Sequence, residues 1–459
     1  MSQLSFSSLQ LQSDLLNNLE TLGYTSMTEI QSQSLPHILD GNDVIAQGQT
    51  GSGKTAAFGL GLLEKLDVER FRIQSLILCP TRELADQVAK EIRKLGRGIH
   101  NIKVLTLCGG MPLGPQIGSL EHGAHIVVGT PGRIEDHLRK GKLKLDHVNL
   151  LVLDEADRML EMGFQDALDA IIECTPSERQ TLLFSATFPD QIQSIAKRIM
   201  KQPVMVQVAS THDSTSIQQH VYEIGDIDRL TAVRLLLMQH NPESAVIFCT
   251  TKRETQEIAD ELRRYGFSAL ALNGDLEQKD RDQTLTRFMN KSISVLVATD
   301  VAARGLDVEA LDMVINYQFA HDNEVHVHRI GRTGRAGNQG MACTLYDEKE
   351  HYKLDALEAY LGHSIEVESL PSFDVLDKPI SVPLMTTLRI DAGKKQKIRP
   401  GDILGALTRE NGIAGSQVGK IQLAPNWAYV AVSRDIVKKA LNMLEQGKLK
   451  GRKIRVQRL

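Results

Sequence analysis

The 459-residue sequence has no apolar run that approaches the ~18–20 residues of a membrane-spanning helix. Its first residues, from Met1 to Phe6, lack the basic-then-apolar layout of a secretory signal peptide. Cysteine is scarce, without a CxxC pair, and occurs at Cys79, Cys108, Cys174, Cys249 and Cys343. An odd number of widely spaced cysteines fits reduced thiols in a cytosolic protein better than disulfides or zinc sites. We therefore expect a cytoplasmic protein with no membrane partner.

The chain also has little net charge, −4 from 53 Lys+Arg and 57 Asp+Glu, but this total conceals a segregation. Residues 384–459 hold 16 Lys+Arg and 5 Asp+Glu, a net charge of +11, so residues 1–383 carry −15. A basic module on an acidic body indicates an anionic partner for the C-terminal end. The alternative is a solvated basic tail. The strand-like run Trp427–Val432 and the helical stretch Asp435–Glu445 favour a folded module.

The length predicts two to four domains at ~100–200 residues each. From about residue 40 to 205, β-rich apolar runs alternate with helical periodicity, and this alternation restarts after the polar stretch 210–216. Continuous apolar strands separated by helices predict parallel sheets that are covered on both faces. The clearest strands are expected at Ser75–Cys79, Ile126–Gly129, Leu150–Leu153, Thr181–Ser185, Ala245–Cys249, Ser294–Ala298 and Met313–Tyr317. Three prolines within 370–383 mark a second joint. The predicted domains are 1–209 and 217–365, followed by a linker at 366–383 and a small domain at 384–459.

Residues 48–55 fit the phosphate-loop pattern G-x4-G-K-[ST], between an apolar strand and a helical run. Glycines allow backbone N–H groups to surround phosphate oxygens, and the helix N-terminus adds positive potential. Lys54 can reach the β- and γ-phosphates, and the Thr55 hydroxyl can bind Mg2+. The alternative, a glycine-rich turn with a surface lysine, is disfavoured by the strand-loop-helix context. The other nucleotide contacts expected here are Gln49, Thr50, Gly51, Ser52 and Gly53.

An acidic segment follows the apolar strand Leu150–Leu153. Asp154 at the strand tip suits Mg2+ binding, and Glu155 could orient or deprotonate the attacking water. Taken alone, such a segment is more often a helix N-cap, but a phosphate loop earlier in the chain favours the metal role. Further along, the run His328–Arg335 contains three arginines spaced by three residues. These could project guanidinium groups across a domain cleft, or they could belong to an exposed basic loop.

In this order, the motifs resemble those of DEAD-box RNA helicases over essentially all of residues 1–365. Residues 154–157, Asp-Glu-Ala-Asp, match the box that names the family, and 48–55 match its phosphate loop. Residues 23–31 look like the adenine-reading Q motif, in which Met27 replaces the usual proline. The resemblance makes Gln31 the adenine reader, with Tyr24 in the same motif and Phe6 as the upstream stacking aromatic. It implies two tandem RecA-like α/β domains, ATP and Mg2+ as cofactors, and RNA-stimulated hydrolysis of ATP to ADP and phosphate.

The same resemblance assigns the remaining roles residue by residue. RNA contacts are expected from Pro80, Thr81, Arg82, Gly110, Thr130, Pro131, Gly132, Arg133, Gln278, Arg281 and Thr299. Nucleotide contacts from the second domain are expected from Gly305 and Asp307, and γ-phosphate contacts from Arg332 and Arg335. Coupling of hydrolysis to strand separation is assigned to Ser185, Ala186, Thr187 and His328. Because Lys54, Asp154 and Glu155 belong to one domain and both arginines to the other, the resemblance implies catalysis when both close on ATP.

Residues 384–459 resemble an RNA recognition motif, a small α+β domain whose sheet stacks bases on aromatic side chains. The expected central strands are Thr387–Asp391 and Pro425–Val432, which would place Trp427 and Tyr429 on one face. Arg389 occupies the aromatic position of the first strand, so these two rings could stack on bases or belong to the core. An alternative phosphate-binding surface comprises Lys394, Lys395, Lys397, Arg399, Lys448, Lys450, Arg452 and Lys453.

A helicase core followed by such a module is similar to the DbpA-type subgroup of the family. That resemblance implies a function in ribosome assembly, with large-subunit ribosomal RNA or pre-ribosomal particles as the partner. No obligate protein partner is expected. Two other functions stay open at this point. One is an ATP-gated RNA clamp or scaffold, and the other is a DNA translocase that uses the same two-domain core.

Overall fold

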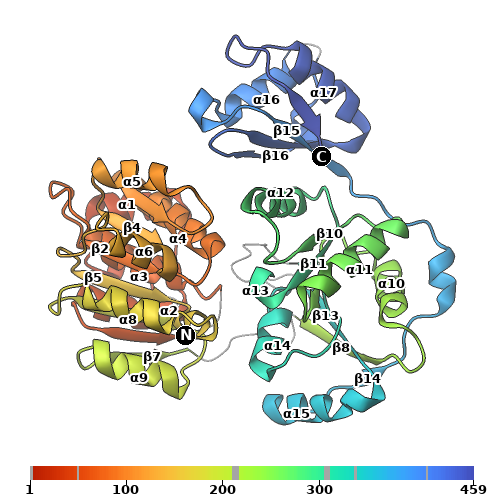
Figure 1. Cartoon of the computed structure of the whole chain (residues 1–459), viewed down its shortest axis with the longest axis horizontal. Helices are drawn as coiled ribbons and strands as arrows, with labels where there is room; N and C mark the ends of the chain where they lie inside the picture. The colour runs from red at the N-terminus through yellow and green to blue at the C-terminus, as the bar shows by residue number, and fades with distance from the viewer. Residues whose placement is uncertain (1–3, 49–50, 209–216, 304–310, 335–338, 410–411) are drawn as a thin grey trace. The chain divides into compact units, whose positions relative to one another are not determined.

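The computed structural model describes residues 4–48, 51–208, 217–303, 311–334, 339–409 and 412–459 (Figure 1). The chain divides into two compact units, one comprising residues 1–211 and the other most of the chain from 212 to 459. Within the described ranges, no helix is long and apolar enough to cross a membrane.

The first unit is built on a seven-stranded parallel sheet with the order β3-β4-β2-β5-β6-β1-β7. Its strands are β1 (Val44–Gln47), β2 (Ser75–Leu78), β3 (Val104–Leu107), β4 (Ile126–Gly129), β5 (Leu150–Asp154), β6 (Gln180–Ser185) and β7 (Val204–Gln207). Its helices are α1 (Ser13–Thr21), α2 (Glu29–Leu39), α3 (Lys54–Glu64), α4 (Arg82–Leu95), α5 (Leu113–Glu121), α6 (Pro131–Arg139), α7 (Ala156–Glu161), α8 (Gln165–Glu173) and α9 (Asp190–Ile199). Phe58 of α3 and Val88 of α4 belong to the core on one face, and Ile134 of α6 and Leu168 of α8 to the core on the other. The central strands are mostly apolar, as expected of a sheet that helices cover on both faces.

The second unit begins with another seven-stranded parallel sheet, in the order β10-β11-β9-β12-β13-β8-β14. Its strands are β8 (Ile217–Glu223), β9 (Ala245–Cys249), β10 (Ala269–Leu272), β11 (Val295–Thr299), β12 (Met313–Asn316), β13 (Gly340–Tyr346) and β14 (Val367–Glu368). Its helices are α10 (Arg229–His240), α11 (Lys252–Arg264), α12 (Gln278–Met289), α13 (Asp300–Ala303), α14 (Asn323–Ile330) and α15 (His351–Leu361). Each of the strands listed above for residues 75–317 is present in one of these two sheets, which confirms the parallel α/β fold.

The C-terminal part of the second unit is a small α+β domain, as expected. Its four-stranded antiparallel sheet has the order β16-β17-β15-β18. The elements are β15 (Met385–Ile390), α16 (Pro400–Thr408), β16 (Val418–Leu423), β17 (Ala428–Ser433), α17 (Val437–Gln446) and β18 (Val456–Arg458). Both helices lie on one face of the sheet (Figure 1). Ile403, Leu407 and Leu444 of these helices belong to the core of this domain. Short 3-10 helices occur at Phe6–Ser8, Gly96–Gly98, Glu348–Glu350, Phe373–Asp377, Lys394–Gln396, Gly415–Gln417 and Arg434–Ile436.

Candidate functional site

The phosphate loop lies between β1 and α3, at the carboxyl edge of the first sheet. The N–H of Gly48 donates to the carbonyl oxygen of Ser185 at 3.0 Å, which fixes the start of the loop to the end of β6. Gly51 and Gly53 have φ angles of 90° and 95°, in the region that glycine adopts without steric cost. Two of the predicted contacts, Gln49 and Thr50, lie outside the described residues.

A buried lysine and a buried carboxylate lie beside this loop. Lys54 is the first residue of α3, and its Nζ donates to the carbonyl oxygen of Gly48 at 2.5 Å. Thr55 follows it with a half-buried side chain. Asp154 ends β5 and is 2% exposed, and burial raises its pKa to about 7 although Lys54 opposes the shift. A desolvated carboxylate at a strand tip fits a divalent cation, whose charge would offset the cost of burying the ionised group.

Glu155, the next residue, adopts a left-handed backbone conformation with φ 53° and ψ 52°. This conformation costs a non-glycine residue about 1–2 kcal/mol. Glu155 also occupies the N-cap position of α7, but its side chain makes no cap hydrogen bond, so the helix-cap alternative accounts for its backbone and not for its carboxylate. Strained backbone of this kind occurs at functional sites, where the surrounding structure holds it.

The acidic segment is tied to the segment that was assigned to coupling. Oδ2 of Asp157 accepts hydrogen bonds from the N–H and the hydroxyl of Thr187, both at 3.1 Å. The N–H of Asp157 donates to Oγ of Ser185 at 3.4 Å, and the carbonyl oxygen of Ala186 accepts from Nε2 of Gln47 at 3.3 Å. Residues 185–187 therefore join the ends of β5 and β1.

The predicted adenine reader is held against the phosphate loop. Gln31 is buried, its Oε1 accepts from the N–H of Thr28 at 2.9 Å, and its Nε2 donates to the carbonyl oxygen of Gly53 at 3.1 Å. The Thr28 hydroxyl donates to the carbonyl oxygen of Ser52 at 2.7 Å, a link that the sequence did not reveal. A primary amide has two donor and two acceptor positions, so one of each remains on Gln31 for adenine.

The two predicted aromatic contacts of adenine pack against each other. Phe6 is buried, and its ring centre lies 6.1 Å from that of Tyr24 in an edge-on arrangement. The hydroxyl of Tyr24 donates to Glu91 at 2.7 Å. The N–H of Met27 donates to the carbonyl oxygen of Leu4 at 2.9 Å, a bond that the family's usual proline could not make. A contact of Phe6 or Tyr24 with adenine stays a prediction.

The RNA-contact segments expected in the first unit follow three neighbouring strands, β3, β4 and β2, so they meet at one edge of the sheet. Pro80 precedes Thr81, whose hydroxyl accepts from the N–H of Leu84 at 3.3 Å and caps α4. The guanidinium of Arg82 lies against Gly110, because a Cβ placed on this glycine would fall 1.7 Å from Nη1. Gly110 also has a φ of 69°, which favours glycine.

The third of these segments begins α6. Thr130 is its N-cap residue, Pro131 occupies its first turn, and Gly132 is exposed with open space where a Cβ would stand. Nη1 of Arg133 donates to the carbonyl oxygen of Met111 at 2.9 Å. The structure thus brings the three segments together, as their proposed common role requires.

In the second unit, one expectation is wrong. Arg329 does not project as an arginine finger, because it is 3% exposed and forms a two-point ion pair with Asp300 at 2.6 and 2.8 Å. Helix α14 ends at Ile330, so Arg332 lies in the following turn with a half-buried side chain. His328 is half-buried on α14. Arg335, Gly305 and Asp307 lie outside the described residues.

Two of the predicted RNA contacts of the second unit, Arg281 and Thr299, bond the backbone of α13. Nη2 of Arg281 donates to the carbonyl oxygen of Ala302 at 2.9 Å, and Thr299 Oγ1 accepts from the N–H of Ala302 at 3.4 Å. Gln278 opens α12 and donates to Asp282 at 2.7 Å.

The sheet of the C-terminal domain contacts the end of α12 and the loop that follows it. Thr286 donates to Gln422 at 3.2 Å, and Oγ1 of Thr387 lies 3.3 Å from Nδ2 of Asn290 and 2.6 Å from Oγ of Ser292.

This contact bears on the two aromatic side chains of the domain. Tyr429 pairs with Arg389 across the strands and is 2% exposed, so its predicted base-stacking role does not fit and the core alternative holds. Burial raises the pKa of Tyr429 to about 12, and Asp280 and Asp282 of α12 add to the shift. Trp427 precedes β17 and is half-buried, with the Arg389 guanidinium 5.4 Å from its ring centre.

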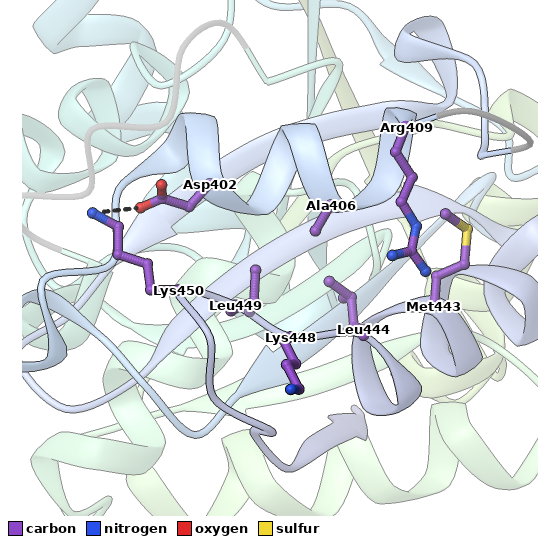
Figure 2. Close-up of a pocket in the computed structure, with 9 residues that line it drawn as sticks. Asp402, Ala406, Arg409, Met443, Leu444, Lys448, Leu449 and Lys450 are labelled. Atoms are coloured by element: carbon purple, nitrogen blue, oxygen red, sulfur yellow. Dashed lines mark ion pairs between the residues drawn. The ribbon is translucent and has the colours of Figure 1, made fainter.

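The predicted basic surface is exposed, and four of its residues, Lys448, Lys450, Arg452 and Lys453, line two pockets of the C-terminal domain. The first, of about 300 Å³, lies between α16, α17 and the following loop (Figure 2). It is lined by Asp402, Ala406, Arg409, Met443, Leu444, Gly447, Lys448, Leu449 and Lys450. The second, of about 330 Å³, shares Leu449 and Lys450 and adds Arg452, Lys453 and Arg455. Lys394, Lys395, Lys397 and Arg399 are also exposed. Arg409 and Arg455 were missed, and the +11 charge of the domain was the only sequence signal for them.

Comparison with known proteins agrees with this geometry. Residues 28–195 match the family described as DEAD/DEAH box helicase, 225–337 the helicase conserved C-terminal domain, and 387–458 the DbpA RNA binding domain. The chain is 51% identical to ATP-dependent RNA helicase DbpA of Escherichia coli (strain K12), over 97% of each chain. It is 37% identical to DbpA of Bacillus subtilis (strain 168), over 98% of each. A solved structure of S. cerevisiae Dbp5 bound to RNA and ADP BeF3 matches with a TM-score of 0.72 and 31% identity, covering 81% of this chain and 96% of that one.

The class of this protein follows from its fold and motifs. It is an ATP-dependent RNA helicase with two parallel-sheet domains that carry these motifs and a basic α+β domain after them. The chain belongs to the DEAD-box helicase family and carries the DbpA RNA-binding domain at its C-terminal end. The expected fold class and enzyme class are therefore confirmed.

Proposed function

We propose that this helicase remodels large-subunit ribosomal RNA during ribosome assembly and is directed to it by residues 384–459. The observation that carries the proposal is a folded domain of net charge +11 in which several basic side chains line two adjoining pockets. Its similarity to the DbpA RNA binding domain supports the choice of RNA.

The placement of charge indicates which surface binds RNA. The sheet face that carries Tyr429 is closed, whereas Lys448, Lys450, Arg452 and Lys453 are exposed beside the pockets. Lysine and arginine at a rim bind phosphates, and an apolar floor such as Ala406, Leu444 and Leu449 suits an unstacked base (Figure 2). We therefore place the RNA-binding surface of this domain at the pockets.

In the ATPase core, we propose that the residues act as the family motifs suggest. Lys54 binds the β- and γ-phosphates of ATP, Thr55 and Asp154 hold Mg2+, and Glu155 orients or deprotonates the attacking water. Bound Mg2+ supplies positive charge to the phosphates. Arg332 and Arg335 of the second unit are the proposed γ-phosphate contacts. The bonds between Asp157 and Thr187 link this site to residues 185–187.

The test compares ATPase stimulation of the full chain by large-subunit ribosomal RNA, an unrelated structured RNA and single-stranded DNA. The proposal requires half-maximal stimulation at a concentration about 1,000-fold lower for the ribosomal RNA than for the unrelated RNA, the lower end of the specificity ratios typical of nucleic-acid-binding proteins. Equal stimulation by both RNAs would refute the ribosomal target. Equal stimulation by DNA would revive the translocase alternative.

A further inference from the structure

A buried glutamine links two of the segments that we propose to contact RNA. Gln116 lies on α5, is 8% exposed, and belongs to none of the motifs described above. Its Nε2 donates to the carbonyl oxygen of Cys108 at 2.9 Å. Its Oε1 accepts from Nη1 of Arg133 at 3.0 Å and lies 2.9 Å from Nε2 of His137. One amide therefore bonds the end of β3 and two side chains of α6.

These bonds fix both ends of the turn that contains Gly110. Cys108, held by Gln116, precedes the two glycines, and Met111, held by Arg133, follows them. Because Arg133 bonds both Met111 and Gln116, the turn, α5 and α6 form one connected network. Loss of the amide would release the turn at Cys108 and leave the guanidinium of Arg133 with one fewer acceptor.

The orientation of the amide follows from its partners. Arginine is a donor only, so Oε1 must face Arg133 and Nε2 must face the carbonyl oxygen of Cys108. His137 then donates from Nε2, as a neutral ring of one tautomer. Burial, and then the charge of Arg133, lowers the pKa of His137, which favours this neutral form. The amide has one arrangement that satisfies all three partners, and a rigid arrangement is what a positioning role needs.

We propose that Gln116 is a positioning residue for RNA binding. It holds the Gly110 turn and the first turn of α6 in the register in which both meet the same RNA backbone, without touching RNA itself. The inference rests on the RNA contacts proposed for Gly110 and for residues 130–133.

The test measures steady-state ATPase of the full chain against RNA and ATP concentration. Gln116→Leu keeps a similar volume and removes all three hydrogen bonds. We expect the RNA concentration for half-maximal stimulation to rise about tenfold, the effect of losing one or two net hydrogen bonds. We expect kcat at saturating RNA and KM for ATP to change by less than about twofold, because the ATP site keeps its contacts. A merely destabilising substitution would not separate these quantities. Gln191→Leu, at an exposed position of α9, is the matched control and should leave all of them unchanged.

A second variant covers the case in which Gln116→Leu does not fold. Gln116→Glu keeps the acceptor for Arg133 and His137, but it replaces the donor to Cys108 with a second carboxylate oxygen that repels the Cys108 carbonyl oxygen. The turn is then released at Cys108 while Arg133 stays held, so we expect the half-saturating RNA concentration to rise about threefold. Arg133→Ala reports on the proposed RNA contact itself. If Arg133→Ala raises the half-saturating RNA concentration and neither Gln116 variant does, the positioning role is refuted and the RNA contacts stand. If Arg133→Ala has no effect, the RNA contacts fail and the inference fails with them. If the Gln116 variants lower kcat and leave the half-saturating RNA concentration unchanged, the proposed positioning role is also refuted.

Discussion

Thr187 donates two hydrogen bonds to one carboxylate oxygen of Asp157, from its backbone N–H and from its hydroxyl, both at 3.1 Å. The two residues follow neighbouring strands, β5 and β6, and Asp157 stands directly after the proposed water-orienting segment. If residues 185–187 couple hydrolysis to strand separation, as their resemblance to the family motif predicts, these two hydrogen bonds are the route from the acidic segment, and the hydroxyl bond can be removed on its own.

Replacing Thr187 with valine should uncouple RNA-stimulated ATPase activity from duplex unwinding. The substitution keeps the side-chain shape and the backbone bond but removes the hydroxyl bond to Asp157. We expect duplex unwinding to fall about tenfold while RNA-stimulated ATPase falls less than about threefold, since one charge-assisted hydrogen bond is lost away from the phosphates. Unwinding and ATPase are measured on the same preparation. Parallel losses in both would contradict the coupling role, and Thr187→Ser, which keeps the hydroxyl, serves as control.

Glu155→Gln should stop turnover without abolishing ATP binding. The amide cannot accept a proton from water, so we expect kcat to fall at least about 100-fold, the usual size of general-base effects. RNA binding in the presence of ATP, measured by filter retention, should persist. Glu173→Gln, at the exposed end of α8, is the control.

The Glu155→Gln variant also distinguishes an RNA helicase from an ATP-gated RNA clamp. If Glu155→Gln still displaced strands through repeated cycles, the proposed role of Glu155 would be wrong. If it failed to turn over yet restored ribosome assembly in cells that lack the protein, the work of the protein would be holding RNA.

Met27→Pro should weaken ATP binding through the N-terminal segment. Proline has no N–H, so the bond to the Leu4 carbonyl oxygen is lost and the 3-10 helix that carries Phe6 is freed. We expect KM for ATP to rise about threefold, in line with the loss of one net hydrogen bond. Met27→Leu keeps the N–H and should behave as the unaltered chain. An unchanged KM in the proline variant would argue against a role for Phe6 at the adenine.

Two exposed lysines of the basic surface test where the C-terminal domain holds RNA. Lys448→Ala with Lys453→Ala should weaken binding of the ribosomal RNA and reduce the slope of log affinity against log salt by about 1–2. The matched control removes the same charge elsewhere, with Lys349→Ala and Lys378→Ala, both exposed outside this domain. Equal effects of the two pairs would show a general electrostatic attraction and no defined surface.

The stability of the second unit should depend on pH through His326. Burial, and then the charge of Arg329, lowers the pKa of His326 from 6.5 to about 3, although Asp300 opposes the shift. The folded protein therefore keeps this ring neutral at a pH where the unfolded chain protonates it. The contribution of the neutral His326 ring to the free energy of unfolding is fully present above pH 6.5 and is lost as the pH falls towards 3.

The expected loss is about 1.4 kcal/mol of unfolding free energy between pH 7.5 and 5.5, from this residue alone. Urea titrations of the full chain at both pH values measure it. His326→Leu should show a smaller difference between the two pH values, whatever its absolute stability, and exposed His321→Leu should not. An unchanged pH dependence in His326→Leu would contradict the assignment.

The buried strands could be predicted because their surroundings are uniform. Strands such as Ile126–Gly129 and Ala245–Cys249 are covered on both faces, and this leaves a continuous apolar run in the sequence. The two-residue strand β14 and the partly exposed β7 carry no such run, and they were not expected. The clustering of the motifs that directly follow strands could also be predicted, because the carboxyl ends of parallel strands lie at the same edge of a sheet.

The sequence-based predictions fail where residues far apart in the chain determine the environment of a side chain. Arg329 shares its spacing with Arg332, but its partner Asp300 stands 29 residues earlier and turns it into a structural ion pair. The position of Tyr429 in its strand could be predicted from the alternation of side chains. Its burial could not, because α12 and the residues after it, far away in the sequence, contact this sheet. Gln116 carries no local pattern at all, because its three partners come from β3 and α6.

Helix α12 carries different contacts at its two ends. Its first turn holds Gln278 and Arg281, proposed to meet RNA, and Asn290, directly after its last turn, bonds Thr387 of the C-terminal domain. Twelve residues at about 1.5 Å each separate these points by about 18 Å. If RNA binds at the basic pockets and at the first turn of α12, as we propose, the length of α12 sets the spacing between the C-terminal domain's contact with this helix and the proposed RNA contacts of Gln278 and Arg281.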